Sequence, residues 1–229
     1  MIVLSSNNVG GTEDDQTELS DTVVFTGSFG TNTILHFAAN DGGEFFGVGN
    51  DLLDFTSYLD MVAATRPASA EGDDYRYEET VPVTFENEYA GGNFNGDHNQ
   101  IGLLRFSDLW AEFDADDAPA SFADFGAGDL ETALNEGWSV GGTGTFWEGN
   151  EFLVLVGKDG EIRMDETSVG NDDWIFDAAY ATNEFKVFTG EVVEDDGDLE
   201  FSIIGMMGTV DLADTDLAWL TADNFTAAA

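Results

Sequence analysis

The apolar residues of this chain come in short runs, and each run ends at glycine, asparagine or an acidic residue. Runs of β-branched and aromatic residues bounded in this way are typical of strands. The chain has 27 Gly against 3 Pro, which suits many turns between strands. We therefore expect a mainly β fold, either a β-sandwich or a β-roll-like arrangement with one or two short helices, forming a single domain over residues 1–229. The expected strands are Asp21–Thr26, Thr33–Phe37, Val81–Phe85, Phe152–Val156, Lys186–Thr189 and Leu199–Ile204.

Two segments have helical spacing of their apolar residues. Leu103–Phe113 places Leu103, Phe106, Leu109, Trp110 and Phe113 on one stripe, which predicts a helix. Asp129–Asn135 is shorter, and glycine lies near both of its ends.

Two later segments share one pattern. Asn150–Met164 and Asn183–Ile203 both begin Asn-Glu-Phe, and each places an acidic turn between two strand-like runs. This pattern predicts two β-hairpins, with turns at Lys158–Gly160 and Asp195–Gly197. Similar turn chemistry explains the match as well as duplication does.

The charge of the chain is strongly negative. There are 47 Asp and Glu against 6 Lys and Arg, a formal net charge of −41. This sign opposes binding to nucleic acid and to anionic membrane surfaces. Hydrophobic residues make up 42% of the chain and aromatic residues 13%, so it can bury a core and the charge does not indicate disorder. No apolar run reaches the length of a transmembrane helix, and we expect no membrane insertion.

The acidic residues gather in clusters, which repel unless salt or a bound cation compensates them. Hard carboxylate and amide oxygens favour Ca²⁺. The chain has no Cys and can form no disulfides. If it is secreted, we expect a bound metal ion to stabilise the fold instead. One cluster, Asn93, Asn95 and Asp97, alternates like the opening of an EF-hand loop but lacks the closing Glu. The other candidate Ca²⁺ ligands are Asn50, Asp51, Asp54, Asp159, Glu161, Asp172, Asp173, Asp195, Asp196 and Asp198. At each place a solvated turn is the alternative, and we expect at least one true site.

The segment Gly47–Phe55, GVGNDLLDF, resembles one unit of the RTX nonapeptide G-G-x-G-x-D-x-U-x, with Phe46 in place of the leading Gly. The wider phrase Asp21–Leu59 resembles segments of the same family. Residues Asp198–Ala229 contain LTADNF and no Lys or Arg, and they resemble the uncleaved C-terminal signal of RTX-type proteins exported by type I systems. The resemblance implies Ca²⁺ binding, an extracellular location and an ABC-type exporter as partner. The chain has no array of units, and Tyr75–Glu148 does not match the family.

Residues for catalysis are scarce. The chain has only His36 and His98, no Cys, and neither an HExxH nor a GxSxG motif, so we expect no enzyme. The apolar run Met1–Leu4 is followed by polar Ser5, so it is too short to resemble the core of a signal peptide.

Three functions remain. The first is a secreted, non-enzymatic structural protein that assembles with copies of itself into a layer, filament or matrix, with Ca²⁺ stabilising acidic turns and contacts. The second is a halophilic soluble protein whose acidity is a salt adaptation. The third is a secreted adhesin or ligand-binding module.

Overall fold

The computed structural model describes the chain in separate stretches. The described residues are 1–3, 21–35, 37, 51–58, 83–85, 101–110, 113, 118–137, 149, 151–158, 161–169, 173–196, 198–212, 219–220 and 224–226. Most of them lie in strands, which confirms the mainly β fold class with a few short helices. Among these stretches, no helix is long and apolar enough to cross a bilayer.

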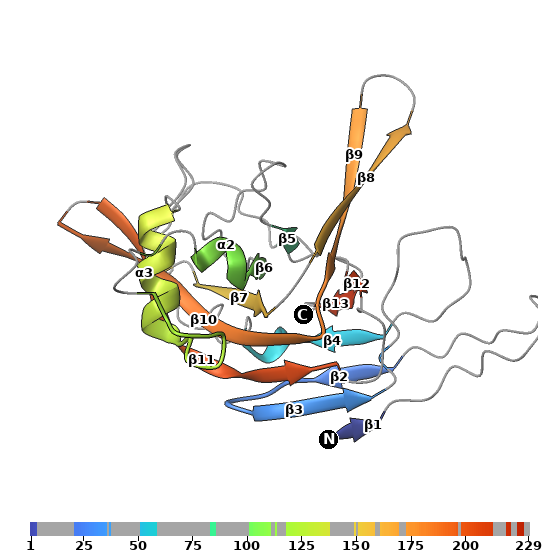
Figure 1. Cartoon of the computed structure of the whole chain (residues 1–229), viewed down its shortest axis with the longest axis horizontal. Coiled ribbons are helices and arrows are strands. Elements are labelled where there is room, and N and C mark those ends of the chain that lie inside the picture. The colour runs from blue at the N-terminus through green and yellow to red at the C-terminus, as the bar shows by residue number, and fades with distance from the viewer. Residues whose placement is uncertain are drawn as a thin grey trace, which may run out of the picture.

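A seven-stranded sheet forms the centre of the fold, with the strand order β1-β3-β11-β10-β7-β6-β5 (Figure 1). A second sheet has the order β13-β4-β2, and a third has the order β12-β9-β8. The strands of the first sheet are β1 (Ile2–Val3), β3 (Gly30–Leu35), β5 (Val83–Phe85), β6 (Ile101–Arg105), β7 (Glu151–Gly157), β10 (Glu184–Asp195) and β11 (Asp198–Asp211). The others are β2 (Thr22–Val24), β4 (Leu52–Asp54), β8 (Glu161–Val169), β9 (Asp173–Ala181), β12 (Trp219–Leu220) and β13 (Phe225–Thr226).

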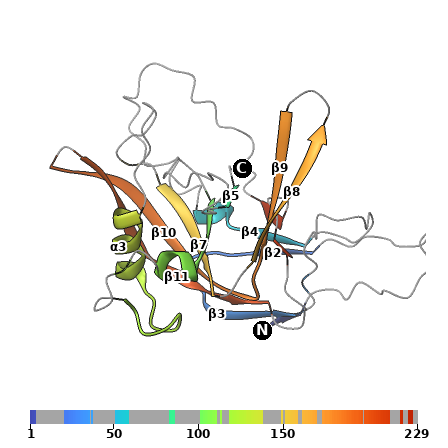
Figure 2. The same ribbon diagram turned by 45° about the horizontal axis from the view of Figure 1, so that its top comes forward.

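Both faces of the central sheet are covered, and strand alternation separates two cores. On β7, Leu153 and Leu155 join the core shared with β2, β4 and β13, whereas Val154 and Val156 join the core beneath the helices. All four side chains are fully buried. A strand covered on both faces needs apolar residues at consecutive positions, which explains the unbroken FLVLV run. The fold therefore has three layers: the small β13-β4-β2 sheet, the seven-stranded sheet, and the helices α2 (Phe106–Trp110) and α3 (Ala127–Gly137) (Figure 2).

Short parallel strands build a three-coil roll at one end of these layers. In the central sheet β1, β3 and the end of β11 are parallel, and in the small sheet β2, β4 and β13 are parallel. Taken in chain order, β1 and β2 form coil 1, β3 and β4 form coil 2, and β11 and β13 form coil 3. The coils follow the same order in both sheets. This arrangement gives the expected roll-like character, although segments far apart in the sequence supply its coils.

The helix predicted over Leu103–Phe113 is wrong in its first part. Residues Ile101–Arg105 form strand β6, where Leu103 pairs with Leu155 of the parallel strand β7. The helix α2 then covers only Phe106–Trp110, and Arg105 contacts Asp108 of its first turn with nitrogen–oxygen distances of 2.6 and 2.8 Å. Burial on both faces made an apolar strand resemble a helical stripe. The prediction at Asp129–Asn135 is confirmed, and α3 extends it at both ends.

One of the two predicted hairpins is confirmed. Strands β10 and β11 pair antiparallel down to Asp195 opposite Asp198, with Asp196 in the left-handed region at φ 50°. The other prediction, a hairpin within Asn150–Met164, is wrong because β7 pairs with β10 and β6 while β8 pairs with β9. Both edges of β7 are thus occupied inside the central sheet. The β8–β9 ribbon instead projects away from the layers (Figures 1 and 2).

Side chains of α3 occupy the edge of β11 that faces away from β10. The Asn135 amide donates to the Phe201 carbonyl and accepts from the Phe201 N–H, both at 2.9 Å. The Glu131 carboxylate accepts the Ile203 N–H at 2.7 Å. These side chains make the hydrogen bonds that a neighbouring strand would otherwise make, so the helix blocks this edge from pairing with another chain.

We expect Asn135→Ala to lower the free energy of unfolding by about 1–2 kcal/mol, because it leaves a backbone N–H and a carbonyl of Phe201 without this partner. Urea unfolding measures the change. The matched control is Glu136→Ala, which alters the exposed neighbouring residue and should change stability by less than about 0.5 kcal/mol. Equal effects of the two substitutions would show that the edge contact contributes nothing.

Candidate cation site on the parallel roll

Asp51 lies at the centre of the roll and connects its three coils. Its carboxylate accepts the N–H of Asp21 at 2.9 Å, beside strand β2 of coil 1. Its backbone carbonyl accepts the side-chain amide of Asn224 at 3.1 Å, next to strand β13 of coil 3. Leu52 in turn donates its N–H to the Asp21 carbonyl at 2.8 Å. Asp51 is 2% exposed and Asn224 is fully buried, so these polar groups form part of the interior.

Apolar residues directly beyond this polar group hold the coils in register. Val23, Leu53 and Phe225 occupy equivalent positions on β2, β4 and β13, and all three are buried in one core. The Phe25 and Phe55 rings stack 4.7 Å apart at 13°. The stacked apolar side chains of the neighbouring strands therefore set the spacing between the Asp21 and Asp51 backbones.

The turn after β4 is fixed by local hydrogen bonds. The Asp54 carboxylate accepts the Thr56 N–H at 2.9 Å and caps the helical turn at 56–58. The hydroxyls of Ser57 and Tyr58 donate to the carbonyls of Phe25 and Gly27. Burial raises the pKa of Tyr58 to about 12, so its hydroxyl keeps the donated proton throughout the ordinary pH range.

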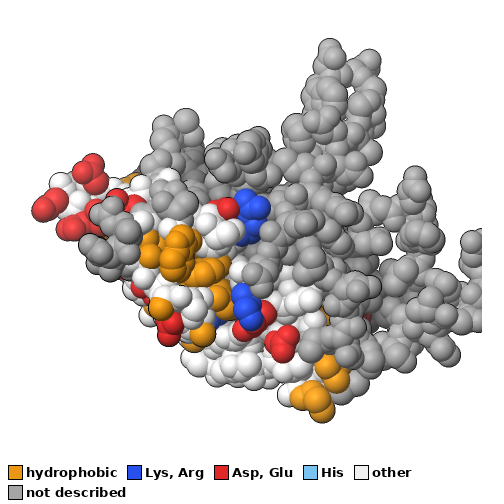
Figure 3. Space-filling view, viewed as in Figure 1, with side chains coloured by type: hydrophobic (Ala, Val, Ile, Leu, Met, Phe, Trp, Pro, Cys, Tyr) orange, Lys and Arg blue, Asp and Glu red, His pale blue; other side chains and the backbone are white. Residues whose placement is uncertain are grey.

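The structure places the predicted ligands in different parts of the fold. Asp51 immediately precedes the three-residue strand β4, and Asp54 is the last residue of that strand. Asp195, Asp196 and Asp198 are exposed at the β10–β11 turn, where Figure 3 shows acidic side chains at the tip of the molecule. Glu161 begins β8 and pairs with Ala181, whereas Asp173 begins β9 and pairs with Val169. The two acidic residues therefore lie at opposite ends of the β8–β9 ribbon. The remaining candidates lie outside the described residues: Asn50, Asn93, Asn95, Asp97, Asp159 and Asp172.

Two residues of this site were missed by sequence reasoning, Asp21 and Asn224. A signal for Asp21 was present: DTVVF at Asp21–Phe25 and DLLDF at Asp51–Phe55 share Asp, a central apolar residue and Phe at the same spacing. In the sequence, Asp223 likewise stands two residues before the buried Phe225. Nothing local marks Asn224 as a partner of Asp51, because 173 residues separate them.

The donor set at this place suits a hard cation. Asp21, Asp51 and Asn224 carry oxygen ligands of the kind that Ca²⁺ binds, and Ca²⁺ takes six to eight such oxygens, commonly including backbone carbonyls and water. Within the stretches that the structure describes, no group of three or more His, Cys, Asp or Glu side chains forms a ready-made metal cluster. A cation here would therefore depend on amide and carbonyl oxygens as well as on carboxylates.

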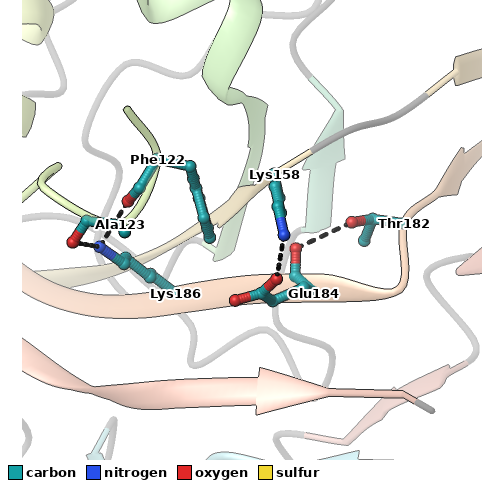
Figure 4. A network of polar contacts seen from close by, with 6 residues as sticks. All are labelled: Phe122, Ala123, Lys158, Thr182, Glu184 and Lys186. Carbon is teal, nitrogen blue, oxygen red and sulfur yellow. Dashed lines mark hydrogen bonds and ion pairs between the residues drawn. The ribbon is translucent and has the colours of Figure 1, made fainter. Parts of the chain in front are cut away.

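A second polar network is centred on a buried side-chain ammonium group, that of Lys186. The Lys186 ammonium donates to the carbonyls of Phe122, Ala123 and Phe125 at 2.7, 3.1 and 2.6 Å. Figure 4 shows the contacts with Phe122 and Ala123. The ammonium also lies 4.9 Å from the centroid of the Phe122 ring. Lys186 is 6% exposed, and this burial lowers its pKa, an effect that the carboxylates of Glu184, Asp124 and Asp129 oppose.

The Lys186 network holds the 121–126 loop, and through it α3, against the central sheet. Beside it, the Lys158 ammonium pairs with the Glu184 carboxylate at 2.8 Å on a more exposed surface (Figure 4). Sequence reasoning did not single out Lys186, because an isolated Lys in a strand gives no local sign that it points into a core. Three acceptor carbonyls around one ammonium define a structural site, with all three of its protons donated.

The fold and these two networks define a class: a mainly β protein in which a three-coil parallel roll continues into a larger mixed sheet. Comparisons with protein-family models, with curated proteins and with solved structures found no match to this chain.

Proposed function

We propose that this chain is a non-enzymatic, extracellular structural protein that assembles with copies of itself, and that Ca²⁺ stabilises its acidic roll. The observation that carries the proposal is the position of Asp51, a buried carboxylate that links three parallel coils in the segment resembling an RTX unit. Parallel coils with an Asp before each short strand are the setting in which RTX repeats bind Ca²⁺. Asp21 and Asn224 are the described residues that would share the ion.

The net charge supports a role for a divalent cation. At −41, copies of this chain repel one another, and acidic clusters within one copy oppose compaction. Ca²⁺ binding at an affinity of about 10⁻⁴–10⁻³ M, usual for extracellular modules, would leave the folded chain less stable at cytoplasmic Ca²⁺ levels and stabilise it outside the cell.

The place of the C-terminal segment fits export before folding. Phe225 is buried and pairs with Leu53 of β4, so the part of the sequence that resembles a secretion signal supplies the third coil. An ABC-type exporter would read this segment while it is extended. Completion of the roll after export would then bury Phe225 and draw Asn224 against Asp51.

The test compares CaCl₂ with NaCl at equal ionic strength, using light scattering and negative-stain microscopy, and ends with a chelator. We expect assembly and a higher melting temperature with Ca²⁺ alone, both reversed by chelation. Stabilisation by either salt to the same extent, without assembly, would contradict the proposal and favour a halophilic adaptation.

Asp51→Asn probes the ion at the roll directly. The amide oxygen still accepts the Asp21 N–H, but the charge that attracts Ca²⁺ is lost, so we expect the Ca²⁺ concentration for half-maximal stabilisation to rise about tenfold or more. Thermal unfolding across a Ca²⁺ titration measures it. The control, Glu136→Gln, removes one exposed carboxylate from α3 and should leave this concentration unchanged. Equal midpoints for wild type and Asp51→Asn would place the ion elsewhere.

A further inference from the structure

Coil 1 carries the two most exposed large apolar side chains of the described structure. Met1 beside β1 is 83% exposed and Val24 on β2 is 60% exposed. Figure 3 shows hydrophobic side chains at the lower edge of the molecule, where Figure 1 has β1. Met1 directly precedes β1 and Val24 lies on β2, so each of the two sheets has an exposed apolar side chain at its coil 1 end.

Both strands of coil 1 also lie at sheet edges. β1 is the first strand of the seven-stranded sheet and β2 is a terminal strand of the β13-β4-β2 sheet. Among the described residues, neither strand has a neighbour on its outer side. Phe25 donates its N–H to Asp54 on the inner side at 2.9 Å, and alternation along a parallel ladder then directs the N–H and carbonyl of Val24 outward. Unpaired backbone groups of this kind accept a further strand.

The described strands of coil 1 carry no charged side chain, in a chain that is otherwise highly acidic. Residues 1–3 and 22–24 contain no Asp, Glu, Lys or Arg, although 47 of the 229 residues are acidic, and the charges nearest to them in the sequence are the Met1 α-ammonium and the partly buried Asp21. A copy with the same net charge of −41 meets the least side-chain repulsion at such a place. A basic partner would be expected to select an acidic surface instead, so the absence of charge favours a second copy of this chain.

The opposite end of the roll restricts how that copy is placed. There β11 already pairs with β10, so the coil 3 end has no free edge in the larger sheet. A partner that pairs with β1 and β2 together must present two edges at the same separation. In the described structure, coil 1 of the second copy does so, and a contact between identical surfaces has two-fold symmetry.

We propose that coil 1 is a self-association surface through which two copies join edge to edge, with antiparallel strands about a two-fold axis. This contact is one component of the proposed assembly, and it rests on the proposed function in taking the partner to be a second copy. Because the strands of this surface carry no acidic side chains that a cation would have to neutralise, the dimer forms without Ca²⁺. The Ca²⁺-dependent contacts then join dimers rather than monomers.

The experiment measures the mass of the full chain by analytical ultracentrifugation in a chelator at moderate ionic strength. Val24→Lys places two ammonium groups at the contact, and Val24→Pro removes an outward N–H while sparing the inner ladder. The matched control is Ile204→Lys, because Ile204 is 58% exposed but lies on β11 outside coil 1. Circular dichroism verifies that each variant remains folded.

We expect the wild type and Ile204→Lys to be dimers in the chelator, and both Val24 variants to dimerise at least tenfold more weakly. A wild-type monomer in the chelator, or equal dimerisation of folded Val24 variants, would overturn this inference. If dimers form but Ca²⁺ causes no further assembly, the proposed function fails while the coil 1 contact stands. If Ca²⁺ drives assembly of monomers, the function stands and the coil 1 contact fails.

Discussion

Lys186→Met should lower the free energy of unfolding by about 2–3 kcal/mol. The substitution keeps the length and apolar stem of the side chain but removes the donor for the carbonyls of Phe122, Ala123 and Phe125. A buried acceptor left without a donor costs about 1–3 kcal/mol, and part of that cost is recovered because the ammonium no longer has to be desolvated. The full cost falls on the Phe125 carbonyl, because the Phe122 carbonyl also accepts the Phe125 N–H at 3.3 Å and Ala123 is exposed to water. A typical domain is stable by only 5–15 kcal/mol, so the loss is large.

The control for this prediction is Lys158→Met on the same sheet. The Lys158 side chain is 48% exposed and pairs with Glu184, which is 34% exposed, so its removal should cost less than about 1 kcal/mol. Urea unfolding at fixed pH and salt compares the two variants with the wild type. Both remove one positive charge, and a difference between them therefore reports burial rather than net charge. Equal losses would show that the three carbonyl contacts do not stabilise the fold.

Gly208→Ala should lower the free energy of unfolding by about 2–3 kcal/mol. A Cβ at Gly208 would fall far inside van der Waals contact with the Gly30 carbonyl and the Phe29 ring. Gly208 pairs with Gly30 where β11 meets β3, and Gly30 has a φ of +66° that L side chains rarely adopt. Because the obstacle is backbone, relief requires the junction of coils 2 and 3 to separate.

Gly205→Ala is the matched control on the same strand. The nearest atom to an added Cβ there is the Met207 methyl group at 3.7 Å, an ordinary contact with a flexible side chain. We expect this variant to change stability by less than about 0.5 kcal/mol. Thermal or urea unfolding of both variants distinguishes a local steric effect from a general sensitivity of β11 to Ala. Similar destabilisation by the two substitutions would contradict the close packing of coils 2 and 3.

We expect the stability of the two sides of the central sheet to depend differently on Ca²⁺. The helix layer is held by the side chain of Lys186, so its docking needs no ion from solution. The roll is held partly around Asp51, where the proposed Ca²⁺ would act. If both proposals hold, removal of Ca²⁺ weakens the contacts around Asp51 first, while β1 and β2 stay paired with β3 and β4 and α3 stays docked on the sheet. Hydrogen exchange in the presence and absence of chelator would locate this difference.

Local patterns in the sequence were sufficient for much of the strand content. The runs around Val23, Ile34 and Leu153 are short, apolar and bounded by turn residues, and each became a strand because alternation and β-branching act over a few residues. The turn at Asp195–Gly197 was also predictable, because an acidic residue followed by Gly between two apolar runs favours a tight hairpin. The exposed Asp196 indeed adopts a positive φ.

The pairing partners could not be predicted in the same way. The stripe at Leu103–Phe113 fits a helix by spacing, yet Leu103 lies in a strand because β7 offers a parallel neighbour and both faces of the sheet are covered. The predicted pairing of β7 with β8 failed for a related reason, since β10 and β6 already occupy the two edges of β7. These choices depend on segments that are distant in the sequence.

Composition and neighbours a few residues away were enough to establish the mainly β class, the acidic character of the chain and the hairpin turn at Asp195–Gly197. The tertiary structure alone decided that Asp51 meets Asn224 across 173 residues and that Lys186 reaches three carbonyls more than 60 residues away. Those contacts arise when parallel strands stack and helices cover a sheet. The physical reason is that burial and hydrogen bonding between distant segments, rather than local propensity, set the environment of each polar group.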